Sequence, residues 1–276
     1  MWRRRRERVI ELKSPEEVAR MRAAGLLVGE TLQLLRGAVA PGVTTAELDA
    51  LAEEHIRSGG GVPSFKGYHG FPATICASVN DEVVHGIPGP RALRDGDVVS
   101  IDCGAIVEGW HGDSAVTVPV GAVGEELARL LAVCEEAMWR GMAAARLGGT
   151  VSDIGGAIEA FVRAQGEYGL VQEYVGHGIG TAMHQEPQVP NYAHSARRSP
   201  RIVEGMVLAV EPMLNLGTRH TRLLEDGWTV VTADGARSAH FEHTFTVTAE
   251  GPRVLTALDG GAAGLAAVGA SAAARP

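Results

Sequence analysis

Four carboxylates and one imidazole stand at positions where the neighbouring residues predict a buried backbone. They are Asp102, Asp113, His177, Glu211 and Glu242. A buried carboxylate is unfavourable unless it is paired, protonated or bound to a metal. Oxygen ligands with one nitrogen suit a pair of divalent cations, of the Co, Mn, Fe(II) or Zn kind, better than a structural zinc. Two bridged cations can generate a hydroxide near neutral pH and polarise a carbonyl, so the set predicts a metal-dependent hydrolase.

Two of these carboxylates share a predicted β-hairpin. Residues 98–120 are rich in strand-forming types around a turn at 107–109, which places Asp102 and Asp113 on facing arms. Cross-strand partners approach within about 5 Å, and two carboxylates that close repel unless a cation or a proton lies between them. A single strand carboxylate is more often hydrogen-bonded or at a sheet edge, and a histidine between glycines is more often a loop residue. The metal-site prediction therefore depends on the five residues together.

The elements predicted to position these residues are two helices followed by strands, and then two more helices followed by strands. Capping boxes that begin at Ser14 and Thr44 predict the starts of two helices, and apolar periodicity predicts two more, over 125–147 and from Ser152. Short strands and loops are expected in 59–90, a turn at 176–180, and further strands at 171–175, 206–214, 228–232 and 241–248. This order predicts an α+β fold in which helices cover one face of an antiparallel sheet, and it leaves open an internal duplication.

Composition restricts the class of protein. The chain has 276 residues, 45% hydrophobic and 21% charged, which excludes wholesale disorder and allows one large domain or two small ones. Its sequence has no apolar run of the roughly 18 residues that a membrane span needs. A net charge of −8 disfavours a dedicated nucleic-acid binder. Three scattered cysteines exclude a disulfide framework and a CxxC zinc site, and the cytoplasm is the expected compartment.

The two ends of the chain differ in composition from its middle. Residues 1–13 are predicted to form a basic flexible lead; no apolar region follows the arginines at 3–6, so a secretory signal is not expected. Residues 258–276 are rich in alanine and glycine and are predicted to form a disordered tail. A single catalytic domain is expected between them, over 14–257.

Motifs along nearly the whole of that domain resemble those of bacterial, type I methionine aminopeptidases. The matching segments are 67–72, 78–80, 85–88, 101–102, 111–113, 176–180, 184–187, 211–213, 226–229 and 242–244. The resemblance implies a pita-bread fold, in which two pseudo-symmetric halves surround a metal pair on a curved antiparallel sheet. It implies that the five residues above are the ligands, with Asp113 and Glu242 bridging the metals. The implied activity is removal of the initiator methionine before a small second residue, by attack of a bridging hydroxide.

The resemblance also implies roles for residues around the metals. Glu211 would shuttle protons, His184 would hydrogen-bond the developing oxyanion, and His85 would contact the scissile amide nitrogen. The residues implied to bind the substrate are Tyr68, Phe71, Cys76, His85, Met183, His184 and Trp228. An apolar pocket of this kind suits the unbranched thioether of methionine.

Some of these positions have an ordinary structural interpretation. Phe65 and Met183 stand where bacterial relatives commonly have Cys and Phe, which affects the expected shape of the pocket. From residue type alone, His85 is a turn residue, and Tyr68 and Phe71 fit core packing equally well. Their assignment to the pocket therefore comes from the resemblance.

Three other interpretations stay open at this point. Prolidases and proline-specific aminopeptidases share the implied fold, but they usually carry an added N-terminal domain, whereas a short lead precedes the first predicted helix here. A peptide-binding or ribosome-associated protein of this fold would typically lack ligands, and all five are present. The arginines within 3–8 could form a nucleic-acid arm; a solvated lead with at most a weak contact to ribosomal RNA is expected instead. A monomer with no membrane or specific DNA partner is the expected form.

Overall fold

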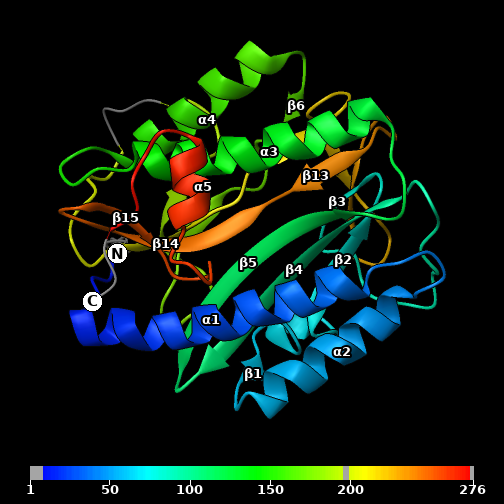
Figure 1. Ribbon diagram of the computed structural model, residues 1–276, viewed down its shortest axis with the longest axis horizontal. Helices are drawn as coiled ribbons and strands as arrows, with labels where there is room; N and C mark the ends of the chain where they lie inside the picture. The colour runs from blue at the N-terminus through cyan, green and yellow to red at the C-terminus, as the bar shows by residue number, and fades with distance from the viewer. Residues whose placement is uncertain (1–8, 195–198, 274–276) are drawn as a thin grey trace, which may run out of the picture.

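The computed structural model describes residues 9–194 and 199–273 (Figure 1). Long helices in these residues are α1 (Pro15–Ala38), α2 (Thr45–Ser58), α3 (Glu125–Ala144) and α4 (Val151–Gln165). The predicted starts of α1 and α2 are confirmed, because Ser14 and Thr44 each exchange hydrogen bonds with the glutamate three residues later. No helix in the described residues is long and apolar enough to cross a bilayer.

The strands are mostly short and antiparallel. They are β1 (Val62–Pro63), β2 (Ile75–Val79), β3 (Glu82–Val84), β4 (Val98–Val107), β5 (Trp110–Pro119), β6 (Gly169–Leu170), β7 (Gly176–Gly178), β8 (Gln185–Val189), β9 (Val207–Val210), β10 (Met213–Asn215), β11 (Thr221–Leu223), β12 (Val230–Thr232), β13 (Ser238–His240), β14 (Glu242–Thr248) and β15 (Gly251–Val254). The main sheet has the order β1-β4-β5-β14-β9-β7-β8, with β2 added on β4 and β15 on β14. Its β4–β5 pair is the predicted hairpin.

Each half of the molecule has its own helix pair and apolar core. Helices α1 and α2 pack on β2, β4 and β5, whereas α3 and α4 cover strands of the second half. Figure 1 shows the two helix pairs on opposite sides of the view, with β5 and β14 between them. These two strands pair with each other and so join the halves. The arrangement confirms the α+β architecture and is consistent with an internal duplication.

Three predictions for the second half are wrong in detail. Residues 171–175 form a loop, and the strand β6 is limited to the two residues before it. The predicted turn at 176–180 begins with strand β7. The predicted strand 206–214 is broken into β9 and β10 at Glu211-Pro212, because proline has no N–H to donate to the ladder.

Described residues of the predicted lead (9–13) and of the predicted tail (258–273) pack on the domain, where the sequence analysis expected flexible or disordered chain. In the lead, Lys13 is buried and its backbone N–H donates to the Gly205 carbonyl at 2.7 Å. In the tail, the alanine-rich segment forms helix α5 (Ala262–Ala267), since alanine favours helix, and it buries Leu265. Residues 3–8 lie outside the described residues, so the contact with ribosomal RNA stays a prediction.

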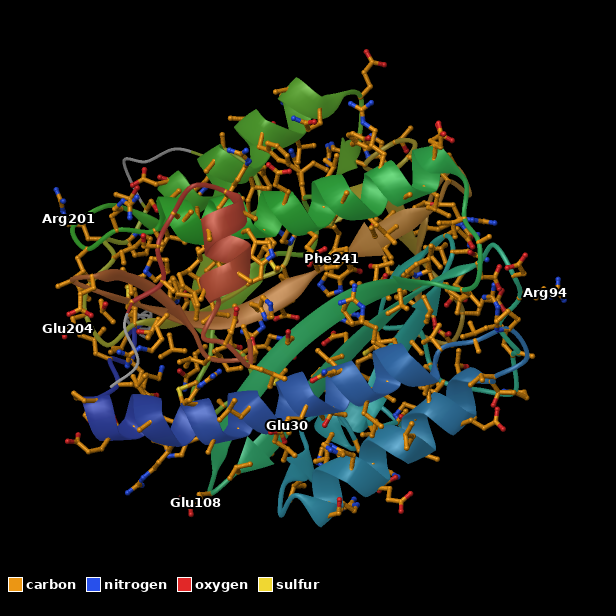
Figure 2. All side chains as sticks on the ribbon, viewed as in Figure 1. Glu30, Arg94, Glu108, Arg201, Glu204 and Phe241 are labelled. Carbon is orange, nitrogen blue, oxygen red and sulfur yellow. The ribbon has the colours of Figure 1, made fainter. Side chains whose placement is uncertain are left out.

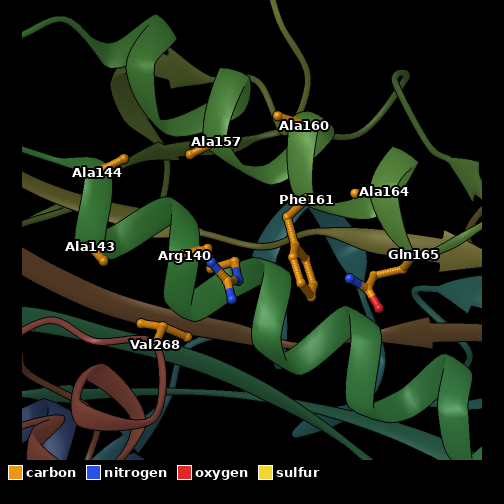
Figure 3. A pocket seen from close by; sticks show the side chains of 9 residues that line it. All are labelled: Arg140, Ala143, Ala144, Ala157, Ala160, Phe161, Ala164, Gln165 and Val268. Carbon is orange, nitrogen blue, oxygen red and sulfur yellow. The ribbon is translucent and has the colours of Figure 1, made fainter.

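Charged and apolar side chains divide as expected for a globular domain. Figure 2 shows Arg94, Glu108 and Arg201 at the periphery and Phe241 in the interior. A surface groove between α3 and α4 has a volume of about 550 Å³ (Figure 3). It is lined mainly by alanines, and Arg140 lies 4.5 Å from the centre of the Phe161 ring within it. None of the candidate metal or pocket residues lines this groove, so we do not assign it to the reaction.

Candidate metal centre and active site

The four carboxylates and the imidazole lie on neighbouring strands of the main sheet. Asp102 is on β4, Asp113 on β5, Glu242 on β14 and His177 on β7, and Glu211 directly follows β9. In the sheet order β4-β5-β14-β9-β7, each strand contributes one of them. Five segments that are far apart in the sequence therefore converge on the middle of the sheet.

The register brings three of the carboxylates together around one small residue. Ala115 on β5 pairs with Asp102 on one side and with Glu242 on the other. Asp113 lies two residues before Ala115, so it points to the same face. Asp102 and Asp113 are thus diagonal neighbours rather than directly opposite, since the backbone partner of Asp113 is Gly104. Their carboxyl groups are still close enough for each to affect the pKa of the other.

The alternation of the strands separates this acidic face from the helix-covered face. Cys103, next to Asp102, belongs to the core beneath α1 and α2. Phe241, next to Glu242, belongs to the core beneath α3 and α4 (Figure 2). Cys103 therefore packs on the opposite face from Asp102, and the acidic face is the one that the helices leave open.

His177 is oriented with one ring nitrogen toward the carboxylates. Its Nδ1 lies 2.9 Å from the Gly178 carbonyl oxygen, which can only accept, so Nδ1 carries the proton and Nε2 has a free lone pair. Nε2 lies 3.7 Å from Asp113 Oδ2 and 3.6 Å from Glu211 Oε1, distances that leave space for an ion between the groups. One ligand atom from each of Asp113, His177 and Glu242 lies within 4.8 Å of the other two.

The charges and unpaired oxygens of this cluster favour the binding of cations. Among the described residues, one buried carboxylate oxygen on each of Asp102, Asp113 and Glu242 has no hydrogen-bond partner. Burial raises the pKa of Asp102 to about 7, and burial together with the neighbouring carboxylates raises the pKa of Asp113, Glu211 and Glu242 well above the ordinary range. Burial lowers the pKa of His177 to about 3, so it supplies no positive charge at neutral pH. The donor set and its orphaned oxygens fit divalent metal ions.

Two supporting residues were missed by the sequence analysis. The Thr244 hydroxyl donates to the Asp113 carbonyl at 2.8 Å and accepts from the Asp113 N–H at 3.2 Å. The Asn191 side-chain amide donates to the Glu211 carbonyl at 3.0 Å. Both hold the backbone of an acidic residue from a separate segment. A threonine two residues after Glu242 on the same strand face was the only signal for the first, and none indicated the second.

Of the two further histidines assigned to the reaction, His184 lies beside the cluster and His85 lies among aromatic rings near Trp228. The ring of His184 is centred 4.4 Å from that of His177, and its Nδ1 lies 2.9 Å from the Tyr68 hydroxyl. Partial desolvation lowers the pKa of His184. His85 adopts a left-handed backbone conformation with φ of 60°, and burial lowers its pKa to about 4. Its ring meets Tyr174, which the sequence analysis did not single out, edge to face with centres 5.7 Å apart.

The predicted pocket residues gather in one apolar cluster. Phe71, Cys76 and Met183 are buried in it, and Tyr68 and Trp228 pack on its edge. The Phe71 and Trp228 rings meet edge to face, with centres 5.1 Å apart. The backbone partner of Cys76 is Asp102, so the cluster adjoins the acidic face. Phe65, which replaces a common Cys, lies in the same cluster, and the His85 ring is centred 6.5 Å from that of Trp228.

Comparison with known proteins identifies the family. The sequence pattern of metallopeptidase family M24 matches residues 19–249. The chain belongs to metallopeptidase family M24. It is 49% identical over 249 residues to the methionine aminopeptidase of Clostridium acetobutylicum, covering 90% of this chain and 99% of that protein. It is 48% identical over 248 residues to methionine aminopeptidase 1 of Bacillus subtilis, with 90% and 99% coverage. These values confirm the resemblance found in the sequence.

Solved structures confirm the pita-bread fold of this M24 protein. The methionine aminopeptidase of Rickettsia prowazekii superposes with a TM-score of 0.87 at 40% identity, covering 90% of this chain and 100% of that chain. The prolidase of Pyrococcus furiosus superposes with a TM-score of 0.70 at 21% identity, covering 89% of this chain and 65% of that chain. The prolidase therefore shares the fold.

The raised pKa values predict an unusual pH dependence for the M24 protein without metal. We expect its free energy of unfolding to fall as the pH rises from about 6.5 to 8. In this range the unfolded carboxyl groups are already ionised, whereas those of the folded cluster still bind protons. Each such group costs about 1.4 kcal/mol per pH unit until the pH passes its folded pKa. Urea unfolding of chelator-treated protein across this range measures the slope.

The buried histidines oppose this trend only at lower pH. Their folded pKa values lie below the unfolded value, so their contribution to stability is lost as the pH falls below about 6.5. Saturating Mn²⁺ is the matched control, because bound cations replace the protons and should remove the decline above pH 6.5. A metal-free protein whose stability stays constant or rises between pH 6.5 and 8 would contradict the assignment of a proton-sharing acidic cluster.

Proposed function

We propose that this protein is a methionine aminopeptidase that removes the N-terminal methionine from nascent polypeptides whose second residue is small. The observation that carries this proposal is a buried acidic cluster that directly adjoins an apolar cluster containing Phe71, Met183 and Trp228. The named activity of relatives at 48–49% identity over nearly the whole chain supports it. All five candidate ligands come from one chain, which supports a monomer as the active unit.

The residues that would hold the metal ions are Asp102, Asp113, His177, Glu211 and Glu242. Asp113 and Glu242 lie on the adjacent central strands β5 and β14, so both would hold the metal ions from the middle of the set. Two divalent cations of the Co, Mn, Fe(II) or Zn kind fit this set of carboxylates and one imidazole. When bound, they would supply a hydroxide at neutral pH and polarise the scissile carbonyl.

Three side chains of the protein then act on the substrate. Glu211, whose side chain is 13% exposed, would take up a proton and deliver it to the leaving amine. His184 would donate from Nε2 to the developing oxyanion, since a Tyr68 hydroxyl that donates to Nδ1 leaves the proton on Nε2. His85 would contact the scissile amide nitrogen, and its lowered pKa keeps that ring neutral at pH 7.

The pocket accounts for selection of the first residue. Phe71, Met183 and Trp228 offer apolar and polarisable surface and no charged partner, so a charged first side chain would be desolvated without compensation. An Asx turn holds Trp228 in place, because the Asp226 carboxylate accepts from the Trp228 N–H at 2.8 Å. Crowding beside the loop that bears His85 would restrict the second residue.

Peptide hydrolysis tests both parts of this selectivity. We expect kcat/KM for Met-Ala-Ser to exceed that for Lys-Ala-Ser and Met-Lys-Ser by several orders of magnitude. Norleucine-Ala-Ser should remain a substrate, because one altered methylene-sized group in an apolar pocket is worth only about 1–3 kcal/mol. Comparable kcat/KM values for Met-Ala-Ser and Lys-Ala-Ser would refute methionine specificity. Faster cleavage of a Xaa-Pro dipeptide than of Met-Ala-Ser would favour the prolidase alternative.

Trp228→Ala tests whether the indole forms the pocket wall. We expect a fall in kcat/KM for Met-Ala-Ser of about 10- to 200-fold, together with weaker discrimination against bulkier first residues. Leu223→Ala is the matched control, because Leu223 is 57% exposed on β11 of the same hairpin. Equal discrimination by the Trp228→Ala variant and the wild type would remove Trp228 from the pocket.

A further inference from the structure

A short loop carries two of the proposed site residues. It joins β7 to β8 over residues 179–184 and bears Met183 and His184. Its first half is held by the backbone, because the Gly180 carbonyl accepts from the His111 N–H at 2.9 Å. Its far end leads into Gln185, the first residue of β8, so the side chain of Gln185 is placed to hold that end.

The segment that precedes α1 holds both polar atoms of the Gln185 side chain. The Lys13 ammonium donates to Gln185 Oε1 at 2.7 Å and to the Glu11 carbonyl at 3.1 Å. The Gln185 Nε2 donates in turn to the Glu11 carboxylate at 2.9 Å. Lys13 is only 5% exposed, and its hydrogen bond to Gln185 is charge-assisted, which makes it stronger than a neutral one. Two residues of the lead therefore anchor the start of β8.

Lys13 also touches the opposite end of the loop. A Cβ atom built on Gly180 would lie 2.6 Å from Lys13 Cε and 2.9 Å from its Nζ, so the end of the lysine packs directly on the glycine. Its own backbone is fixed by the hydrogen bond to Gly205. The chain has two lysines and 23 arginines, and one of the two lysines, with its compact ammonium, occupies this position.

Retaining this ammonium is costly for folding. Burial disfavours the charged form and lowers the pKa of Lys13, against the opposing effect of the Glu11 and Glu17 carboxylates. A buried charge without a carboxylate directly bound to it is unfavourable unless its hydrogen bonds are satisfied. Here the acceptors are the Glu11 carbonyl and Gln185 Oε1, so the ammonium is satisfied only when Gln185, at the end of the loop that follows β7, is in place.

We propose that Lys13, together with Glu11, is a positioning residue that clamps Gln185 and Gly180 and so presents His184 and Met183 to the substrate. This inference rests on the proposed function, in which His184 donates to the oxyanion. A misplacement of about 1 Å in such a donor can reduce the rate about 100-fold. Glu11 and Lys13 therefore belong to the catalytic architecture through the loop that they hold.

Kinetics of Lys13→Met and Gln185→Leu test the clamp. We expect each variant to lose about tenfold or more in kcat for Met-Ala-Ser, with KM changed by less than about threefold and metal content unchanged. The double variant should lose no more than the more affected single variant, because both changes remove the same contact. Lys66→Met is the matched control, since the side chain of Lys66 is 42% exposed and paired with Glu53 at 2.6 Å. The clamp would be overturned if kcat is unchanged in the single variants, or if only KM changes. It would also be overturned if the two single losses in kcat multiply in the double variant.

Hydrogen exchange of the purified protein supplies a readout that does not depend on catalysis. We expect the amides of 181–185 to exchange about tenfold faster in Lys13→Met and in Gln185→Leu than in wild type, and not in Lys66→Met. Unchanged exchange in both variants would overturn the clamp even if activity falls. A wild-type protein that does not hydrolyse Met-Ala-Ser would instead overturn the proposed function, while the exchange data would still decide whether Lys13 holds the loop.

Discussion

Asp113→Ala and Glu242→Ala are each expected to abolish peptide hydrolysis, with a loss of at least about a thousandfold in kcat/KM. Both carboxylates lie on the central strands of the sheet, within reach of His177 and of the other acidic groups. Removal of either deprives the cluster of a proposed bridge, so at least one cation should be released. Hydrolysis of Met-Ala-Ser at limiting metal and calorimetric titration of the metal measure the two effects.

An isosteric pair of variants separates metal loss from unfolding. Asp113→Asn removes one charge from a group of mutually repelling buried carboxylates, so the metal-free variant should be more stable at pH 8 than the metal-free wild type. Added metal should stabilise the wild type and not the variant. Glu108→Gln is the control, because Glu108 is exposed at the tip of the hairpin that carries Asp113 (Figure 2). Near-normal turnover of Asp113→Ala at limiting metal would contradict a dinuclear site.

Local features of this site could be predicted because they depend on short-range chemistry. The capping residues Ser14 and Thr44 act on backbone groups within one turn, so their effect is visible in a few residues of sequence. The β4–β5 hairpin joins adjacent segments, and it brings Asp102 near Asp113 whatever the rest of the chain does. Period-two alternation likewise puts Cys103, the residue after Asp102, on the opposite face of the strand.

Features that depend on distant segments could not be predicted from residue patterns. The diagonal offset of Asp102 and Asp113 and the pairing of Ala115 with Glu242 are set by strand register, which no local motif reports. The alanine-rich tail has a composition typical of disorder, yet it folds where Leu265 finds a buried site on the domain. Composition describes what a segment can do alone, and its neighbours decide whether it packs.

Convergence of the five candidate ligands needed information beyond residue spacing. Their order in the sheet, β4-β5-β14-β9-β7, differs from their order in the chain, so sequence separation does not indicate proximity. Glu211 shows the difficulty, because its apolar neighbours predicted a continuous strand whereas Pro212 ends β9 beside it. Family motifs supplied the expectation that these residues meet, and the strand register explains how the backbone achieves it.

His184→Ala is expected to lower kcat by about 10²–10³-fold, with KM little changed and metal binding retained. The ring lies beside His177 and faces the cluster, and its lowered pKa keeps the imidazole neutral near pH 7. A neutral ring can donate from one nitrogen only, and the contact with Tyr68 favours Nε2 as that donor. Such a donor stabilises charge that develops in the transition state more than it binds the substrate, so its loss should appear in kcat.

Tyr68→Phe distinguishes this role from a structural one. It removes the hydroxyl 2.9 Å from His184 Nδ1 and leaves the ring in place, so the imidazole loses the partner that fixes its tautomer. We expect a smaller fall in kcat, about tenfold, which corresponds to one neutral hydrogen bond. In the His184→Ala background, Tyr68→Phe should have almost no effect on kcat, because the Tyr68 hydroxyl then has no imidazole to orient. Loss of metal from His184→Ala would instead make the residue a ligand, and a rise in KM alone would place it in ground-state binding.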